Sequence, residues 1–118
     1  MKESIVKDKS FKFALSIIKL YSFLAENKEF VMSKQLLKSG TSIGANVNEA
    51  LAGESRADFV HKMAIASKEA RETLYWLELL KQSQIITFDY SLHIEECSEL
   101  NKILTSIVKI TKTNMKCL

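Results

Sequence analysis

The sequence predicts an all-α protein, an antiparallel up-and-down four-helix bundle. The chain of 118 residues has no proline and three glycines, and 47% of its residues are hydrophobic, a composition that favours long helices with short connections. Apolar residues also recur at spacings of three and four in four successive segments, which is the period of a helix with one buried face. Helices of about 20 residues joined by short turns pack as antiparallel neighbours.

The chain is expected to form one domain over residues 1–118, because domains typically hold about 100–150 residues. No apolar run approaches the roughly 20 residues of a membrane span, and the charged first ten residues are unlike a secretory signal, so we expect a cytoplasmic protein. Cys97 and Cys117 would lie roughly 30 Å apart on one helix, too far for a disulfide within one chain.

The first helix is predicted over residues 4–26, followed by a short polar turn at 27–29. Its apolar residues share one face. They are Phe13, Ile17, Leu20 and Leu24. Lys9, Lys12 and Lys19 fall on the opposite face, which we expect to be solvated.

The second helix is predicted to begin with Ser33 as its N-cap and to stop at Gly53. Two glycines interrupt it, each unfavourable by about 1 kcal/mol relative to Ala. Gly40 and Gly44 either let another helix approach closely or mark a break. We favour a continuous helix, because the apolar period runs through both glycines. A phosphate loop is excluded, because the motif lacks the Lys-Ser/Thr ending of a P-loop.

The third helix, residues 55–83, is the segment around which the bundle is organised. Ser55 and Asp58 form a capping pattern at its start. Seven residues at alternating spacings of four and three predict the buried face. They are Phe59, Met63, Ala66, Ala70, Thr73, Leu77 and Leu80.

The fourth helix is predicted over residues 89–113. Its buried face consists of Cys97, Leu100, Leu104 and Ile107. Charge is segregated along it, since residues 83–101 carry four acids and no Lys or Arg, whereas residues 102–118 carry four lysines and no acid. This order complements the helix dipole. The net charge of +3 therefore hides two basic segments, one at each end of the chain.

One combination of motifs is more specific than a generic helical pattern. It is the run QLLKSGTSIGANVNEALAGESRADFVHKMAIASKEARETLYWLELL, preceded by DKSFKFALSIIKLYSFL. Over residues 4–113 the chain resembles the small four-helix-bundle proteins encoded in intervening sequences of bacterial 23S ribosomal RNA genes. The resemblance implies a left-handed bundle that assembles as a homopentamer. It also implies kinship with the accessory protein of diversity-generating retroelements, a basic pentamer thought to bind nucleic acid and a reverse transcriptase.

Polar residues on the second and third helices also recur at helical spacing. They are Asn46, Glu49, Asp58, Lys62, Lys68, Glu69, Glu72 and Trp76, and we call them the polar seam. One interpretation is a solvated face with i,i+4 pairs, such as Asp58 with Lys62. The other is a contact between subunits, where polar groups would set the assembly state.

An enzymatic interpretation rests on two E-x-x-E pairs, Glu69 with Glu72 and Glu96 with Glu99. Converging inside a bundle, four carboxylates would hold Mg²⁺, as in all-α nucleotide pyrophosphohydrolases. The histidines and cysteines do not have the spacing of a metal or nucleophile site. We therefore favour a non-enzymatic protein without a cofactor, and keep the hydrolase as the alternative.

The two basic segments predict a candidate nucleic-acid surface. In an antiparallel bundle the start of the first helix lies beside the end of the fourth. Six lysines would then converge at one end of the bundle, namely Lys7, Lys9, Lys12, Lys109, Lys112 and Lys116. We take Lys9, Lys12, Lys109 and Lys112 as the candidate contacts to RNA or DNA phosphates. Ordinary solubility charge is the competing interpretation.

Overall fold

Four α-helices make up the computed structural model, which describes residues 2–116 and the side chains of residues 5–116. They are α1 (Lys2–Glu26), α2 (Met32–Ala52), α3 (Arg56–Ser83) and α4 (Ser91–Lys116). The predicted all-α fold and order of elements are confirmed. The expectation for Cys117 lies outside the described residues. No helix within the described part of the chain is both long and apolar enough to cross a membrane.

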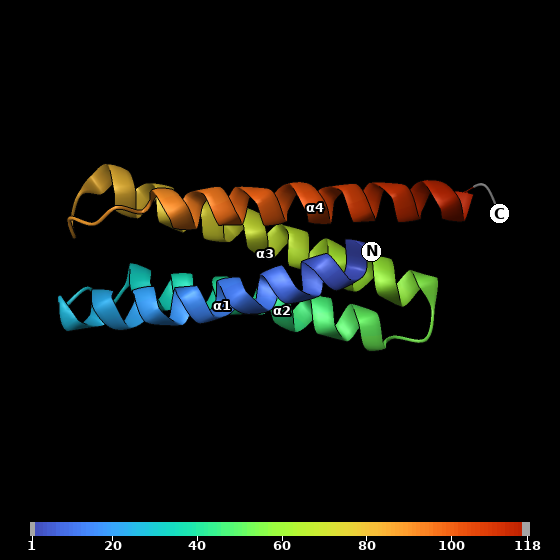
Figure 1. Ribbon diagram of the computed structural model, residues 1–118, viewed down its shortest axis with the longest axis horizontal. Coiled ribbons are helices and arrows are strands. Elements are labelled where there is room, and N and C mark those ends of the chain that lie inside the picture. Colours follow the sequence, from blue (N-terminus) through green and yellow to red (C-terminus); the bar gives the residue numbers. More distant parts are fainter. Residues whose placement is uncertain (1, 117–118) are drawn as a thin grey trace.

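Each helix runs opposite to the one before it, in a body of 52 × 22 × 22 Å (Figure 1). The start of α1 and the end of α4 point toward the same end, and α4 extends further (Figure 1). The four contacting pairs are α1 with α2, α2 with α3, α3 with α4 and, over the smallest interface, α1 with α4. The left-handed sense implied by the resemblance stays a prediction.

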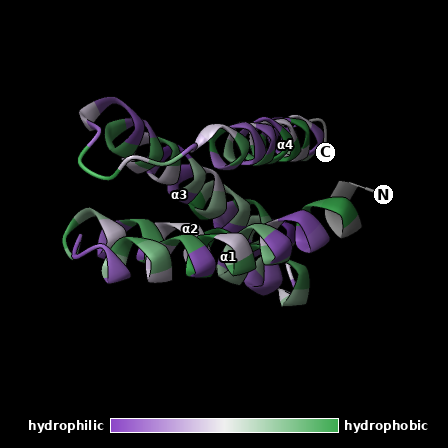
Figure 2. Ribbon diagram, turned by 60° about the vertical axis from the view of Figure 1, so that its left-hand side comes forward, coloured by the Kyte–Doolittle hydropathy of each residue, from purple (hydrophilic) through white to green (hydrophobic). Residues whose placement is uncertain are grey.

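Every helix carries both hydrophobic and hydrophilic residues along its length (Figure 2). The predicted apolar faces of α1 and α4 are buried in full. In α3 the predicted face is buried from Met63 to Leu80, while Phe59 packs at its edge. Fully burying side chains of this size contributes about 1.5–3 kcal/mol each, so the core at these positions holds the bundle together.

Gly40 and Gly44 lie inside a continuous α2, as favoured from the sequence. A Cβ built on Gly40 would lie 2.9 Å from Cγ2 of Ile17 in α1. One built on Gly44 would lie 3.3 Å from the backbone oxygen of Ser10. The glycines therefore allow α1 to pack directly on the backbone of α2.

Replacing Gly40 by Ala should destabilise the protein despite the better helix propensity of Ala. The added methyl meets a β-branched side chain that is stiff and fully buried, and overpacking of this kind costs about 1–3 kcal/mol. We expect Gly40→Ala to lower the free energy of unfolding in urea by about 1 kcal/mol. In an Ile17→Ala background the same change should become neutral or stabilising, and an unchanged loss there would contradict this packing.

The start of α2 differs from the prediction, because Glu29 and not Ser33 supplies the cap. The Glu29 carboxylate accepts hydrogen bonds from the backbone N–H groups of Val31, Met32 and Ser33, at 3.2, 3.2 and 2.6 Å. Ser33 is the second residue of the helix, and its buried hydroxyl donates to the Glu29 carbonyl at 2.7 Å. The carboxylate can satisfy three free N–H groups of the first turn, which a single hydroxyl cannot do.

Removing this cap should weaken α2 measurably. Glu29→Ala leaves three N–H groups without their acceptor, and that of Ser33 is buried, so we expect a loss of about 1–3 kcal/mol in the free energy of unfolding. Glu26→Ala is the matched control, because Glu26 is exposed in the preceding turn of α1. Equal urea midpoints for the two variants would show that Glu29 does not act as the cap.

The other helix ends follow the sequence closely. Gly53 ends α2, and the Ser55 hydroxyl accepts from the backbone N–H of Asp58 at 3.0 Å at the start of α3. Helix α4 begins at Ser91, two residues later than predicted, and the Asp89 carboxylate accepts from the Ser91 N–H at 3.0 Å. At its other end α4 reaches Lys116, three residues beyond the predicted end at 113.

Candidate functional site

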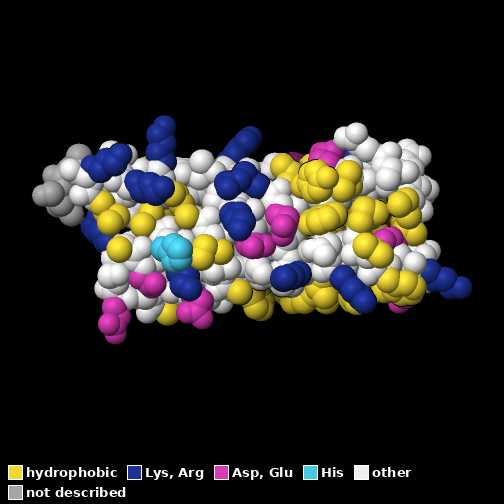
Figure 3. Space-filling model, turned by 180° about the vertical axis from the view of Figure 1, so that it is seen from behind, with side chains coloured by type: hydrophobic (Ala, Val, Ile, Leu, Met, Phe, Trp, Pro, Cys, Tyr) yellow, Lys and Arg dark blue, Asp and Glu magenta, His cyan; other side chains and the backbone are white. Residues whose placement is uncertain are grey.

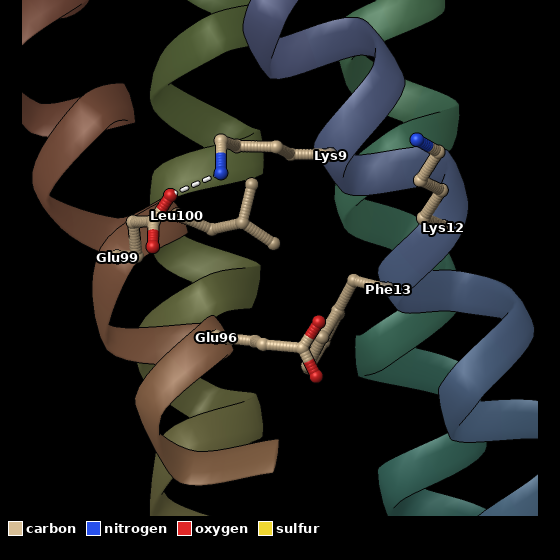
Figure 4. Close-up of a pocket in the computed structure, with 6 residues that line it drawn as sticks. All are labelled: Lys9, Lys12, Phe13, Glu96, Glu99 and Leu100. Carbon is tan, nitrogen blue, oxygen red and sulfur yellow. Dashed lines mark ion pairs between the residues drawn. The ribbon is translucent and has the colours of Figure 1, made fainter. Parts of the chain in front are cut away.

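The first groove beside α4 faces α1 and is nearly balanced in charge. It has a volume of about 180 Å³ and is lined by Lys9, Lys12, Glu96 and Glu99 together with core residues. Lys9 forms an ion pair with Glu99, whereas Lys12 points away from both glutamates (Figure 4). The acidic half of α4 thus offsets the lysines of α1.

The second groove beside α4 faces α3 and is basic. Its volume is about 420 Å³, and its charged lining residues are Arg71, Lys109 and Lys112. Among the residues whose side chains the structure describes, no carboxylate lines this groove. On the face of the molecule seen in Figure 3, Lys and Arg side chains are most numerous over one half, and the largest hydrophobic cluster lies over the upper part of the other half, with further basic side chains along its lower edge.

The six lysines predicted to converge are therefore distributed over several grooves. Lys9 and Lys12 line the groove between α1 and α4, while Lys109 and Lys112 line the one between α3 and α4. Lys7 lies on the α1–α2 side, near Phe11. The groove toward α1 contains only the first of the two candidate pairs, and the groove toward α3 contains only the second. The physical reason is that Lys109 and Lys112 project from the α4 flank that packs on α3.

The polar seam is placed on the flanks of α2 and α3. Glu49, Lys68 and Glu72 are exposed, and the other five members are half-buried. Partial burial is the main influence on Glu69 and raises its pKa, and the neighbouring Glu72 raises it further. Lys68 and Lys38 lower the pKa of Glu69. Since Lys38 belongs to α2, its interaction with Glu69 in α3 links the two helices.

The i,i+4 pairs predicted within the seam do not form ion pairs. Among residues 5–116, the ion pair that the structure contains is Lys9 with Glu99. Asp58 and Lys62 therefore stay beyond ion-pair distance, as do Lys68 and Glu72. Long side chains with access to solvent gain little from being held in one geometry, which accounts for the absence of these ion pairs.

The four carboxylates of the enzymatic alternative do not converge. Glu69 faces the α2 side of α3, whereas Glu96 and Glu99 lie in the groove toward α1. No group of three or more acidic, His or Cys side chains with a metal-binding arrangement occurs within the part of the chain that the structure describes. The Mg²⁺ site expected from the two E-x-x-E pairs is therefore not assembled in this fold.

Two titratable groups in the first part of α4 pack against the core, namely the buried Cys97 and the half-buried His93. The Cys97 thiol donates to the backbone oxygen of Ala70 at 3.2 Å, and burial raises its pKa to about 12. Burial lowers the pKa of His93, and the neighbouring Glu96 raises it by a smaller amount. The His93 ring lies 5.9 Å from that of Phe88. Both groups are thus held in their neutral forms.

The lowered pKa of His93 predicts a loss of stability in acid. The unfolded chain binds a proton at the ordinary pKa of about 6.5, before the folded protein does, so stability falls as the pH drops below that value. We expect His93→Gln to reduce the change in the free energy of unfolding between pH 7 and pH 5.5. His61→Gln is the control, since His61 is exposed, and an equal effect of both changes would contradict the assignment to His93.

Fold and grooves together define a four-helix-bundle protein with one charge-balanced and one basic groove flanking its last helix. A family model described as 23S rRNA-intervening sequence protein matches residues 2–106, so the chain belongs to that family. The resemblance noted from the sequence motifs is thereby confirmed.

A solved structure agrees with this assignment. The chain is 57% identical to a protein of unknown function from the S23 ribosomal protein family of Bacteroides thetaiotaomicron, and the two superpose with a TM-score of 0.88. The similarity covers 92% of this chain and 99% of the Bacteroides chain. No curated protein matches the chain.

The residues of the basic groove that sequence reasoning missed are Ser67, Arg71 and Thr105. Ser67 and Arg71 lie one turn apart on α3, next to its buried face, and Thr105 has the corresponding place on α4. One feature of the sequence could have pointed to Arg71, since it is one of only two arginines in a chain whose other basic residues are lysines and two histidines. Its nearness to Lys109 follows only from how α3 and α4 pack.

Proposed function

We propose that the chain is a non-enzymatic, self-assembling helical bundle that contacts RNA or DNA, and that it works as a homopentamer. The observation that carries this proposal is the basic groove between α3 and α4, whose cations have no carboxylate partner among the described side chains. Uncompensated cations beside one another attract the phosphate backbone and release its counterions.

Assembly multiplies this surface. A ring of identical subunits joins two different patches of each chain and repeats the basic groove around its axis. Five copies together would make several phosphate contacts, even though a single chain has a net charge of only +3. Binding of this kind is sequence-tolerant, because phosphates carry no base information.

Two surfaces support self-assembly. One is an exposed apolar row on α1, in which Phe11, Leu15 and Ile18 are 61%, 48% and 45% exposed. The row flanks a groove of about 230 Å³ between α1 and α2. The other is the polar seam on α2 and α3. Contacts between two different surfaces of identical chains form a closed ring when the rotation from one subunit to the next closes.

The non-enzymatic part of the proposal is supported by the separation of the E-x-x-E carboxylates described above. The hydrolase alternative needs those carboxylates in one cavity. Turnover of nucleotides with Mg²⁺ that is lost in Glu69→Gln would overturn the non-enzymatic assignment.

Solution mass measured by light scattering, with and without short single-stranded RNA or DNA at low salt, tests the proposal. We expect a mass near five protomers that increases when nucleic acid is added. The double change Leu15→Glu with Glu69→Lys should reduce the mass toward one protomer, because it places charge in the apolar row and reverses charge in the seam. Glu95→Lys is the control, since Glu95 is exposed on α4 outside both surfaces.

Charge reversal tests the contact itself. Changing Lys9, Lys12, Lys109 and Lys112 together to Glu should abolish binding at low salt. The pair Lys9 and Lys12 can then be reversed separately from the pair Lys109 and Lys112, because each double variant changes the net charge by the same amount. We expect Lys109→Glu with Lys112→Glu to account for most of the loss, because Lys9 is already paired with Glu99. Wild-type binding by the fourfold variant would contradict the nucleic-acid role.

A further inference from the structure

The basic groove between α3 and α4 is more ordered than a patch of surface lysines. Two hydroxyl groups lie at its floor, 3.5 Å apart, namely Ser67 Oγ from α3 and Thr105 Oγ1 from α4. Ser67 is 5% exposed, whereas Thr105 is open to solvent. Arg71 Nη1 donates to Ser67 Oγ at 3.1 Å. A hydrogen-bonded chain from Arg71 to Thr105 thus crosses between the helices.

The direction of the side chains brings the cations of both helices to this point. In an α-helix each Cα–Cβ bond tilts toward the N-terminus of its own helix. Since α3 and α4 run in opposite directions, Arg71 leans back toward Ser67, while Lys109 leans toward the level of Thr105 from the other side. The hydrogen bond of Arg71 to Ser67 confirms this direction for the guanidinium.

The electrostatic surroundings favour an anion. The end of α4 carries the negative end of its helix dipole, but four lysines and no acid occupy residues 102–118. No ion pair within residues 5–116 involves Arg71, Lys109 or Lys112. The groove toward α1 differs, because Glu96 and Glu99 line it together with the lysines.

From this arrangement we propose that the α3–α4 groove is an oxyanion site that binds one phosphate group, with Arg71 as its central ligand. The inference rests on the proposed contact with nucleic acid in one respect, since the phosphate would then belong to the backbone of RNA or DNA. A free phosphate ion presents the same oxygens as the nucleic-acid backbone, and separate titrations with RNA and with inorganic phosphate distinguish the two ligands.

Each group has a distinct role in this site. A guanidinium has five N–H donors, and one of those of Arg71 is used for Ser67. The others are free to bind two phosphate oxygens at once. The exposed Thr105 hydroxyl can donate to a third oxygen, while Lys109 and Lys112 supply charge. Ser67 is a positioning residue, because it is buried and holds the guanidinium in place.

Titration of the full-length protein with a short single-stranded RNA of mixed sequence measures the role of Arg71. We expect Arg71→Ala to weaken binding about tenfold and to reduce the slope of log affinity against log salt by at least about 0.7. Arg71→Lys should restore only part of the affinity, because an ammonium cannot bind two oxygens in a plane. Arg56→Ala is the matched control, since Arg56 is the other arginine and lies exposed on the same helix.

A second titration with inorganic phosphate, followed by NMR, does not depend on nucleic acid. The two arginines give two side-chain Nε–H signals, which the Arg71→Lys variant assigns. We expect phosphate to shift the Arg71 signal and the backbone signals of Ser67 and Thr105, but not the Arg56 signal. Thr105→Val, which preserves the shape of the side chain, should weaken this response.

The outcomes separate the two proposals. If RNA does not bind but phosphate shifts the Arg71 signals, the oxyanion site is supported and the nucleic-acid function is overturned. If RNA binds and Arg71→Ala behaves like Arg56→Ala, the site is overturned and the function stands. Absence of both responses overturns both.

Discussion

The contact between Ile17 and Gly40 is the constraint on which the arrangement of this bundle depends. Because Gly40 has no side chain, the branched carbons of Ile17 rest on the backbone of α2, and α1 lies close to α2. A one-residue shift along α1 would remove Ile17 from this position and rotate its buried face out of the core. The position of α1 in turn determines which of its side chains meet α4, and over how long a stretch.

The different characters of the two grooves beside α4 follow from that arrangement. The acidic first half of α4 lies opposite the lysines of α1, where Lys9 and Glu99 pair. The basic second half extends past the start of α1 (Figure 1) and packs on α3, where Arg71 adds a further cation. Segregated charge along one helix thus becomes one balanced groove and one unbalanced groove. Only the unbalanced groove is suited to hold an external anion.

Membership of the 23S rRNA-intervening sequence family and the similarity to the Bacteroides structure define the fold of this protein. They leave its activity open, since one fold hosts many functions and function depends on specific sites. Contact with nucleic acid would therefore depend on the particular side chains of this protein. The strength of such a contact depends on whether the cation already has an ionic partner. A paired lysine such as Lys9 attracts a phosphate less strongly than an unpaired one.

The sequence by itself determined the four helices, their buried faces and most of their ends, because these depend on local periodicity and on caps such as Ser55 and Gly53. It also predicted the close helix approach at Gly40. The capping role of Glu29 is also local, since its bonds reach only two to four residues along the chain, but Ser33 offered the more familiar capping residue. The tertiary structure alone decided that the E-x-x-E pairs lie on different sides of the bundle and that Arg71 shares a groove with Lys109. These features depend on which groove a flanking side chain enters, and that is set by the packing and register between helices, which no local pattern encodes.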